Sequence, residues 1–168
     1  MDASLDGAQG MLAAPAHAWF RLLSPGLVEL VFPERTSDAE LHRAFRELER
    51  WMRDDVHAPY GFLVRIDHVL MLTSKQRQIV AGYEARYADV ERRFNAGQAM
   101  VVASPVQRGL FTAFTWLSPL VWPYRVFGDT EAALQWLRAH WADVTHDYPT
   151  GPRWMGRLRG DQDRTRAG

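Results

Sequence analysis

Hydrophobic positions along this chain follow two alternating periods, one typical of strands and one typical of helices. Runs rich in β-branched and aromatic residues occupy 19–23, 27–32, 62–67, 99–103 and 124–127. In between, apolar residues recur every three or four positions over about 38–53, 74–95, 106–117 and 130–141. That spacing gives a helix one buried face. The chain therefore predicts nine elements in the order ββαβαβαβα.

Polar and flexible residues mark the ends of these elements. The turn Ser24-Pro25-Gly26 separates the first two strands and favours a hairpin. Ser37 and Glu40 fit a capping box at the first helix, and Asn95-Ala-Gly97 predicts the stop of the second. Helix N-caps are expected where a side-chain oxygen can accept from the first N–H groups, at Ser37, Thr73 or Ser74, Ser104 and Asp129.

Alternating strands and helices favour a largely parallel sheet with right-handed crossovers, and the hairpin adds an antiparallel edge. We therefore predict an α/β protein with a single mixed, mostly parallel sheet, an N-terminal hairpin and helices packed on the sheet. The domain is expected to cover 17–145. Residues 1–16 are expected to form a flexible arm, and 146–168 a disordered tail that contains arginines.

Composition excludes several classes of function. Lys+Arg and Asp+Glu are 20 each, so no net charge draws a polyanion, and we expect no nucleic-acid partner. The absence of cysteine excludes disulfides, thiolate nucleophiles and cysteine-ligated metals. Residues 1–18 carry no Lys or Arg, and prolines interrupt the apolar stretch 110–124. We therefore expect no signal peptide, no membrane span and a cytoplasmic location.

The last strand and helix carry a resemblance to a known family. Phe127 before the cap, and Ala133-Leu-Gln-Trp-Leu137 in the helix, resemble the STAS-like superfamily. The element order over 19–141 and the segment Ala103-Ser-Pro-Val-Gln-Arg-Gly109 are similar as well. Within that superfamily the chain resembles small bacterial proteins similar to the sporulation anti-sigma-factor antagonist, which are grouped with CRAL-TRIO lipid-binding domains. The resemblance implies a scaffold without catalytic motifs.

In the antagonist branch, a phosphorylatable serine lies where a central strand passes into a helix. The resemblance places that region at 67–74, which makes Ser74 and Thr73 candidate phosphorylation sites. Here Val69-Leu-Met-Leu72 departs from the compact Asp-Ser pattern of the antagonists. The interpretation that Thr73 or Ser74 is only a helix cap is therefore preferred. Asp67, at the carboxyl end of its strand, is a candidate ligand-proximal residue.

The helix 106–117 and the segment after it are richer in aromatic residues than one buried face requires. An exposed aromatic patch is typical of a partner surface. Alternatively, the same side chains line a pocket for a lipid-like apolar small molecule, or a loop or the N-terminal arm covers them. The candidate surface, through which we expect a homodimer or a protein complex, comprises Phe111, Phe114, Trp116, Leu120 and Trp122.

Catalytic and metal signatures do not appear in the sequence. The chain has no Gly-x-Ser-x-Gly elbow and no Gly-rich phosphate loop. One local group of metal-ligand types, near the end of the last helix, lacks a recognised spacing and is interpreted as solvated: His140, Asp143, His146 and Asp147. We expect no cofactor and no metal. The sequence thus predicts a non-catalytic regulatory or protein–protein interaction module.

Charged residues on the long second helix are interpreted as a solvated face of mixed sign. Arginines and carboxylates interleave there, in the set Glu84, Arg86, Asp89, Glu91, Arg92 and Arg93.

Overall fold

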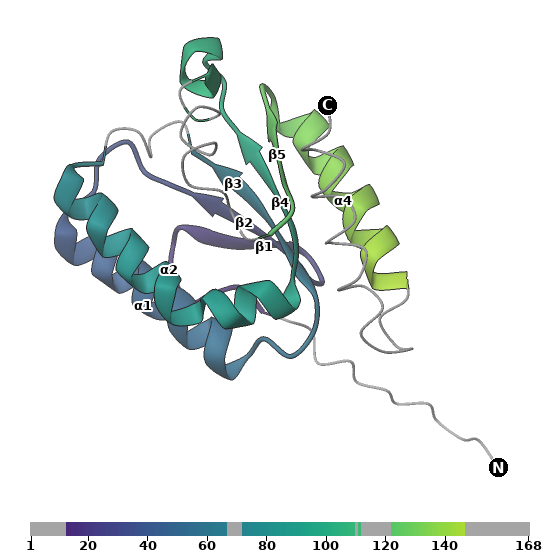
Figure 1. Ribbon diagram of the computed structural model, residues 1–168, viewed down its shortest axis with the longest axis horizontal. Helices are drawn as coiled ribbons and strands as arrows, with labels where there is room; N and C mark the ends of the chain where they lie inside the picture. The colour runs from purple at the N-terminus through teal and green to yellow at the C-terminus, as the bar shows by residue number, and fades with distance from the viewer. Residues whose placement is uncertain (1–12, 67–71, 110, 112–121, 147–168) are drawn as a thin grey trace.

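A five-stranded mixed sheet runs through the centre of the computed structural model, which describes residues 13–66, 72–109, 111 and 122–146. The strands lie side by side in their sequence order (Figure 1). They are β1 (Phe20–Ser24), β2 (Leu27–Val31), β3 (Tyr60–Arg65), β4 (Asn95–Val101) and β5 (Tyr124–Phe127). β1 and β2 are antiparallel, and every later pair is parallel. The predicted α/β class, mixed sheet and N-terminal hairpin are confirmed.

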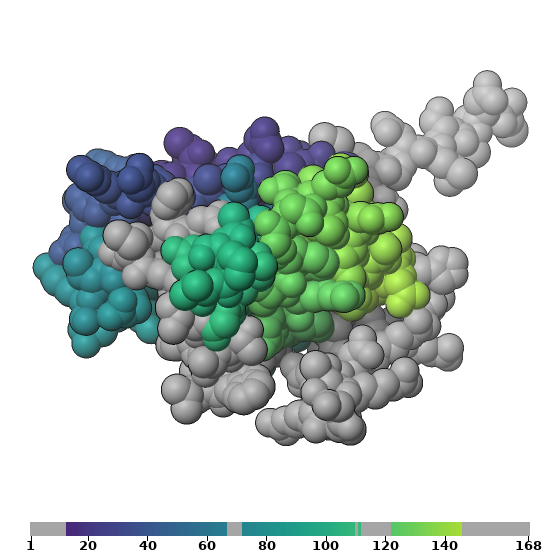
Figure 2. All heavy atoms as spheres, turned by 90° about the horizontal axis from the view of Figure 1, so that it is seen from above, coloured from purple at the N-terminus to yellow at the C-terminus, as the bar shows by residue number. Residues whose placement is uncertain are grey.

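Helices cover both faces of this sheet. α1 (Asp38–Asp54) and α2 (Ser74–Phe94) pack side by side on one face, and α4 (Thr130–His146) packs on the other (Figure 1). Figure 2 shows the same division at the surface, with α1 and α2 in blue and teal on one side and α4 in yellow-green on the other. Residues 105–109 and 111 are also helical.

Alternation along the strands decides which helix each side chain meets. Phe62 and Val64 join the core under α1 and α2, whereas Leu63 between them joins the core under α4. The period of two is that of a strand buried on both faces, as the apolar run predicts.

Side-chain caps start the three helices as the sequence indicates. Thr73 forms a complete capping box: its Oγ1 accepts from Gln76 N at 3.2 Å, and its N–H donates to Gln76 Oε1 at 3.1 Å. Ser37 Oγ accepts from Glu40 N at 3.1 Å, but the Glu40 carboxylate turns to Arg43 and His17. Asp129 Oδ1 accepts from Ala132 N at 2.8 Å.

The predicted helix stop at Asn95–Gly97 is confirmed, because α2 ends at Phe94 and Asn95 is its C-cap, but the same residues also begin a strand. α2 passes directly into β4, and Asn95 has the extended dihedrals φ −73° and ψ 102°. Gly97 is a strand residue at a close approach, because a Cβ there would lie 2.9 Å from His140 Cδ2 of α4. Packing of α4 on the sheet, rather than helix termination, therefore accounts for this glycine.

Part of the expected N-terminal arm lies against α1. The indole Nε1 of Trp51, a side chain that is fully buried, donates to the carbonyl of Ala13. Ala14 packs on the core beneath it. Through these contacts, Ala13 and Ala14 cover the core near the C-terminal end of α1.

Candidate functional site

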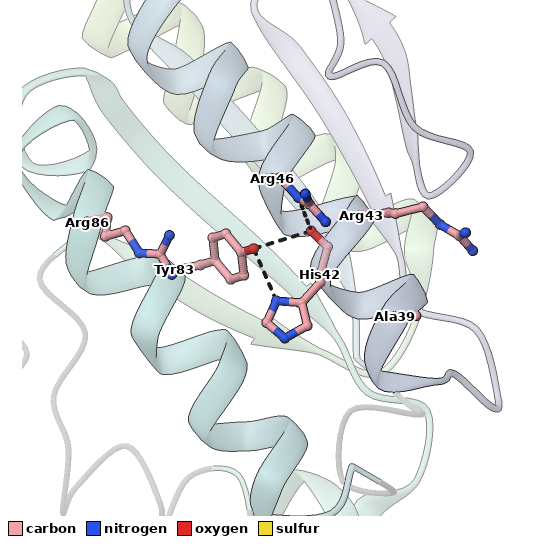
Figure 3. A pocket seen from close by; sticks show the side chains of 6 residues that line it. All are labelled: Ala39, His42, Arg43, Arg46, Tyr83 and Arg86. Carbon is pink, nitrogen blue, oxygen red and sulfur yellow. Dashed lines mark hydrogen bonds between the residues drawn. The ribbon is translucent and has the colours of Figure 1, made fainter.

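A hollow of about 630 Å³ opens on the outer surface of the helical layer, between α1 and α2 (Figure 3). α1 buries Leu41, Ala44, Phe45 and Leu48 toward the sheet, and this orientation leaves the residues between them facing outward. α2 contributes one buried aromatic side chain and one exposed cation from the turn after it. The residues that line the hollow are Ala39, His42, Arg43, Arg46, Tyr83 and Arg86.

His42 and Tyr83 form the floor of the hollow by pointing toward each other across the two helices (Figure 3). Tyr83 Oη lies 3.1 Å from His42 Nδ1 and 3.4 Å from the His42 carbonyl oxygen. The hydroxyl has one proton, which it donates either to the His42 carbonyl, with Nδ1–H then donating to Oη, or to Nδ1 itself. In the second arrangement the proton of a neutral imidazole lies on Nε2, where it can be donated to a ligand.

The arginines of the hollow differ in the ion pairs and hydrogen bonds that they form with other residues. Arg86 lies over the Tyr83 ring, with its Cζ 4.2 Å from the ring centroid, and its Nη1 is 3.3 Å from Glu49 Oε2. Arg43 is paired with Glu40. Arg46 forms no ion pair within the described residues, and its Nε reaches the His42 carbonyl at only 3.5 Å.

The hollow can therefore supply hydrogen-bond donors to an anion. Its three guanidinium groups face two carboxylates, those of Glu40 and Glu49, so positive charge is in excess there. Guanidinium forks bind carboxylates and phosphates through paired hydrogen bonds. Binding of a negatively charged group is the chemistry that this arrangement serves.

The structure places Thr73 and Ser74 at the start of α2, both exposed. Thr73 is the cap, so its hydroxyl already accepts the Gln76 N–H. Ser74 Oγ accepts from Arg77 Nη2 at 3.2 Å, and Lys75 Nζ is 2.6 Å from Asp38 Oδ2 on α1. One cation, the Arg77 guanidinium, thus contacts the Ser74 hydroxyl, while Lys75 next in sequence is paired with Asp38. Asp67 lies outside the described residues.

Two of the five residues expected in the aromatic surface are described. Trp122 is 8% exposed, so its indole is largely removed from solvent. Phe111 is half-buried against the core under α1 and α2, and its ring centroid is 6.5 Å from that of Tyr124. Phe114, Trp116 and Leu120 lie outside the described residues.

The group of metal-ligand types at the end of α4 has a structural use in its described part. His140 Nε2 donates to the carbonyl of Ala96 at 2.9 Å, and its ring stacks on Trp136 with centroids 4.8 Å apart. The described ranges contain no cluster of three His, Asp or Glu side chains that could hold a metal ion. Asp147 lies beyond them.

Glu91 corrects the interpretation of α2 as a solvated mixed face. Its side chain is buried, at 4% exposure, because it follows Tyr87 by one turn on the face that meets the sheet. Asn95 and Tyr60, both fully buried, lie in the same region of the core. Among the described residues, Glu91 Oε2 and Asn95 Nδ2 have no hydrogen-bond partner. Arg92 does follow the prediction, with an exposed pair to Asp89 at 2.6 Å.

Burial shifts the acid–base properties of this region. Desolvation, with the charge of Glu84 second, raises the pKa of Glu91 well above its usual range, and the Asn95 side chain offsets this in part. Burial likewise raises the pKa of Tyr60 and of Tyr87, with the charge of Glu91 the second cause for each. The Glu91 carboxyl group is therefore held in its neutral form well above the pH at which an exposed glutamate ionises.

The sequence did not indicate the hollow, because its residues come from two helices. His42 and Arg46 are one turn apart on α1, and Tyr83 and Arg86 are one turn apart on α2. Those spacings are visible in the sequence as two short polar or aromatic pairs. Only the packing of α1 against α2 brings the pairs together.

None of the described helices combines the length and the apolar character that crossing a membrane requires. Comparison of the chain with protein-family models, with curated proteins and with solved structures finds no match.

Proposed function

We propose that this protein is a non-catalytic regulatory module that acts by binding another protein through the hollow between α1 and α2. The observation that carries the proposal is the convergence of Arg46, Arg86 and His42 on one open surface. A protein segment can reach such a surface without any rearrangement of the core. The α/β scaffold then serves to hold α1 and α2 in the positions that form the hollow.

The charge of the hollow favours this function over the binding of a lipid-like molecule. An apolar ligand needs a pocket lined mainly by apolar side chains. Four of the six lining residues are arginine or histidine, so charged and polar ends stand among the apolar surface that Ala39, the Tyr83 ring and the arginine stems provide. A polar or charged segment of a partner is the better complement.

Site-specific photo-crosslinking tests the proposed function. A photo-reactive amino acid replaces Ala39, an exposed residue of the hollow, in the full chain expressed in its native host. We expect irradiation to give an adduct with a second protein, which denaturing electrophoresis and mass spectrometry identify. The matched control is Ala139, an exposed alanine of α4 on the opposite face of the sheet, which should give no such adduct.

The mass of the adduct also decides between partners. An adduct of twice the chain mass would support self-association, which the sequence predicts through the aromatic surface. Absence of any adduct at Ala39, or equal adducts at Ala39 and Ala139, would contradict binding through the hollow.

A second candidate function is control by phosphorylation of Ser74, in keeping with the resemblance to anti-sigma-factor antagonists. The contact that supports it is the hydrogen bond from Arg77 to Ser74 Oγ at the first residue of α2. A phosphate there would gain from Arg77, from Lys75 and from the N–H groups of the first turn. Thr73 is the poorer substrate, because its hydroxyl is committed to the capping box.

Phosphate mapping separates these two hydroxyls. Protein purified from its native host with phosphatases inhibited is expected to carry phosphate on Ser74 and none on Thr73, as read by peptide mass spectrometry. Phosphate on Thr73 alone, or on neither residue, would count against this second function.

A further inference from the structure

We infer that the hollow between α1 and α2 is a phosphate-binding site, and that its occupant is a phosphorylated residue within a segment of a partner protein. The inference rests on the proposed function and names the chemistry that the partner must carry. Three features of the hollow lead to this inference: its hydrogen-bond donors, the unused hydrogen-bonding capacity of Arg46, and the carboxylates around it.

The donors suit a group with several acceptor oxygens. Arg46 and Arg86 come from different helices, and His42 Nε2 is the third donor when Tyr83 Oη donates to Nδ1. A phosphate monoester has three terminal oxygens and a charge near −2 at neutral pH, so it can accept from several donors at once. A carboxylate has two oxygens and about half that charge, and would leave part of this set unused.

Arg46 is the group in the hollow with the most unused hydrogen-bonding capacity. Its neighbours Arg43 and Arg86 are already paired with Glu40 and Glu49. A contact of 3.5 Å from Nε to a carbonyl is long for a hydrogen bond and contributes little. Both Nη groups of Arg46 therefore remain for a ligand within the described structure, and the fork they form matches two phosphate oxygens.

The surroundings favour a peptide segment over a membrane or a nucleic acid. The carboxylates of Glu40, Glu47 and Glu49 lie on α1, the helix that also carries Arg43 and Arg46, and the net charge of the chain is zero. A bilayer or a nucleic acid presents many phosphates, so it would meet these carboxylates as well. A single phosphorylated residue needs only the donors of the hollow, so it avoids these carboxylates, each of which is already paired with an arginine. At about 630 Å³, the hollow also leaves room for residues beside the phosphate.

Retention of degenerate peptide libraries on the immobilised full chain tests the inference. The probes are libraries with a fixed central phosphoserine or phosphotyrosine and randomised flanks, each compared with the same library lacking phosphate. We expect phosphorylated peptides to be enriched. We expect Arg46→Gln to reduce their retention by roughly tenfold or more, as for loss of a charged hydrogen-bonding partner.

Arg138→Gln is the matched control, because Arg138 is exposed on α4, on the far side of the sheet. An equal loss in Arg138→Gln would show a non-specific charge effect and overturn the site. Circular dichroism of both variants checks that the fold is intact, and Arg86→Gln provides a second variant in the hollow.

The remaining outcomes separate this inference from the proposed function. Equal retention of phosphorylated and unphosphorylated peptides would overturn the phosphate site, while a crosslink from position 39 would leave protein binding intact. Absence of that crosslink would overturn the proposed function itself. Sedimentation with vesicles containing phosphatidylserine or a phosphoinositide provides the other arm: vesicle binding that depends on Arg46, without peptide retention, would assign the site to a lipid headgroup and reject the peptide.

Discussion

Replacing Gly26 by alanine is expected to lower the free energy of unfolding by about 2–4 kcal/mol, which urea denaturation measures. Gly26 lies in the turn between β1 and β2 with φ +79°, a left-handed conformation that costs a residue with a Cβ roughly 1–2 kcal/mol. The new Cβ would also lie 2.7 Å from Cζ2 of Trp141 on α4. The two penalties have different origins and add.

Neither side of this contact can move away easily. The Gly26 carbonyl accepts from Gly61 N at 2.8 Å, so the turn is tied to the start of β3. The Trp141 ring packs on the core between α4 and the sheet. Relief of the close contact would therefore disturb either the β2–β3 pairing or the packing of α4.

A matched control and a second background divide the penalty into its two parts. Gly82→Ala makes the same substitution in α2, where no atom lies within 4 Å of the new Cβ, and should leave stability unchanged or raise it by about 0.5–1 kcal/mol. In a Trp141→Leu background, Gly26→Ala should keep the conformational cost and lose the steric one. An unchanged penalty in that background would assign all of it to the backbone, and a neutral Gly26→Ala would refute both parts.

Elements whose signals are local could be predicted from the sequence. β5 and the start of α4 occupy the expected positions, because Phe127, Asp129 and Leu137 encode a strand end, a cap and a buried helical face within a few residues. The same holds for the hairpin around Gly26, where the turn residue itself demands the conformation. In such segments local preference and tertiary packing agree.

Asn95–Gly97 shows what local signals leave out. An Asn and a Gly after a long helix are typical of a helix stop, and α2 does end at Phe94, but both residues also belong to β4. Asn95 Oδ1 accepts from Gly97 N, two residues further on, at 3.0 Å, which is a local contact, whereas Gly97 admits the ring of His140 on α4. No local pattern contains the information that α4 packs over this point.

The candidate site could not be predicted, for the same reason. His42 and Arg86 are separated by one strand and most of a helix in sequence, and only the α1–α2 contact places them in one hollow. Arginines recur along α2, and the sequence does not indicate which of them lies in the same hollow as His42. For Glu91 the residue type predicts a solvent-exposed side chain, whereas the fold buries it.

Replacing Glu91 by glutamine is expected to raise the free energy of unfolding by about 1–3 kcal/mol near pH 8 and to change it little near pH 4. Glu91 is buried, and its Oε2 has no hydrogen-bond partner within the described residues. Glutamine keeps the shape of the side chain and removes the ionisable group. Urea denaturation of both proteins over this pH range measures the effect.

The direction of this pH dependence follows from the number of protons that the folded and unfolded states bind. Burial raises the pKa of Glu91 in the folded state well above 4.5, the ordinary pKa of a glutamate in an unfolded chain. Above about pH 4.5 the unfolded chain releases this proton while the folded protein still holds it, so the folded state binds more protons. The free energy of unfolding therefore falls as pH rises from 4.5 toward the folded-state pKa, and below 4.5 the contribution of Glu91 to stability is fully present. The glutamine variant lacks this part of the fall, whereas the part due to Glu84, whose pKa desolvation raises to about 7, remains.

Glu34→Gln is the control for loss of a carboxylate, since Glu34 is exposed in the segment before α1. Its unfolding free energy should run parallel to that of the unmodified protein across the pH range. Parallel curves for Glu91→Gln as well would contradict the buried neutral carboxyl group. Tyr60 and Tyr87 share this region of the core, and both are neutral in the folded and unfolded states between about pH 4 and pH 8. Adding Tyr87→Phe to Glu91→Gln should therefore leave the pH dependence of the unfolding free energy almost unchanged in this range. The pH dependence in that range is thus assigned to the carboxyl group and not to its aromatic neighbours.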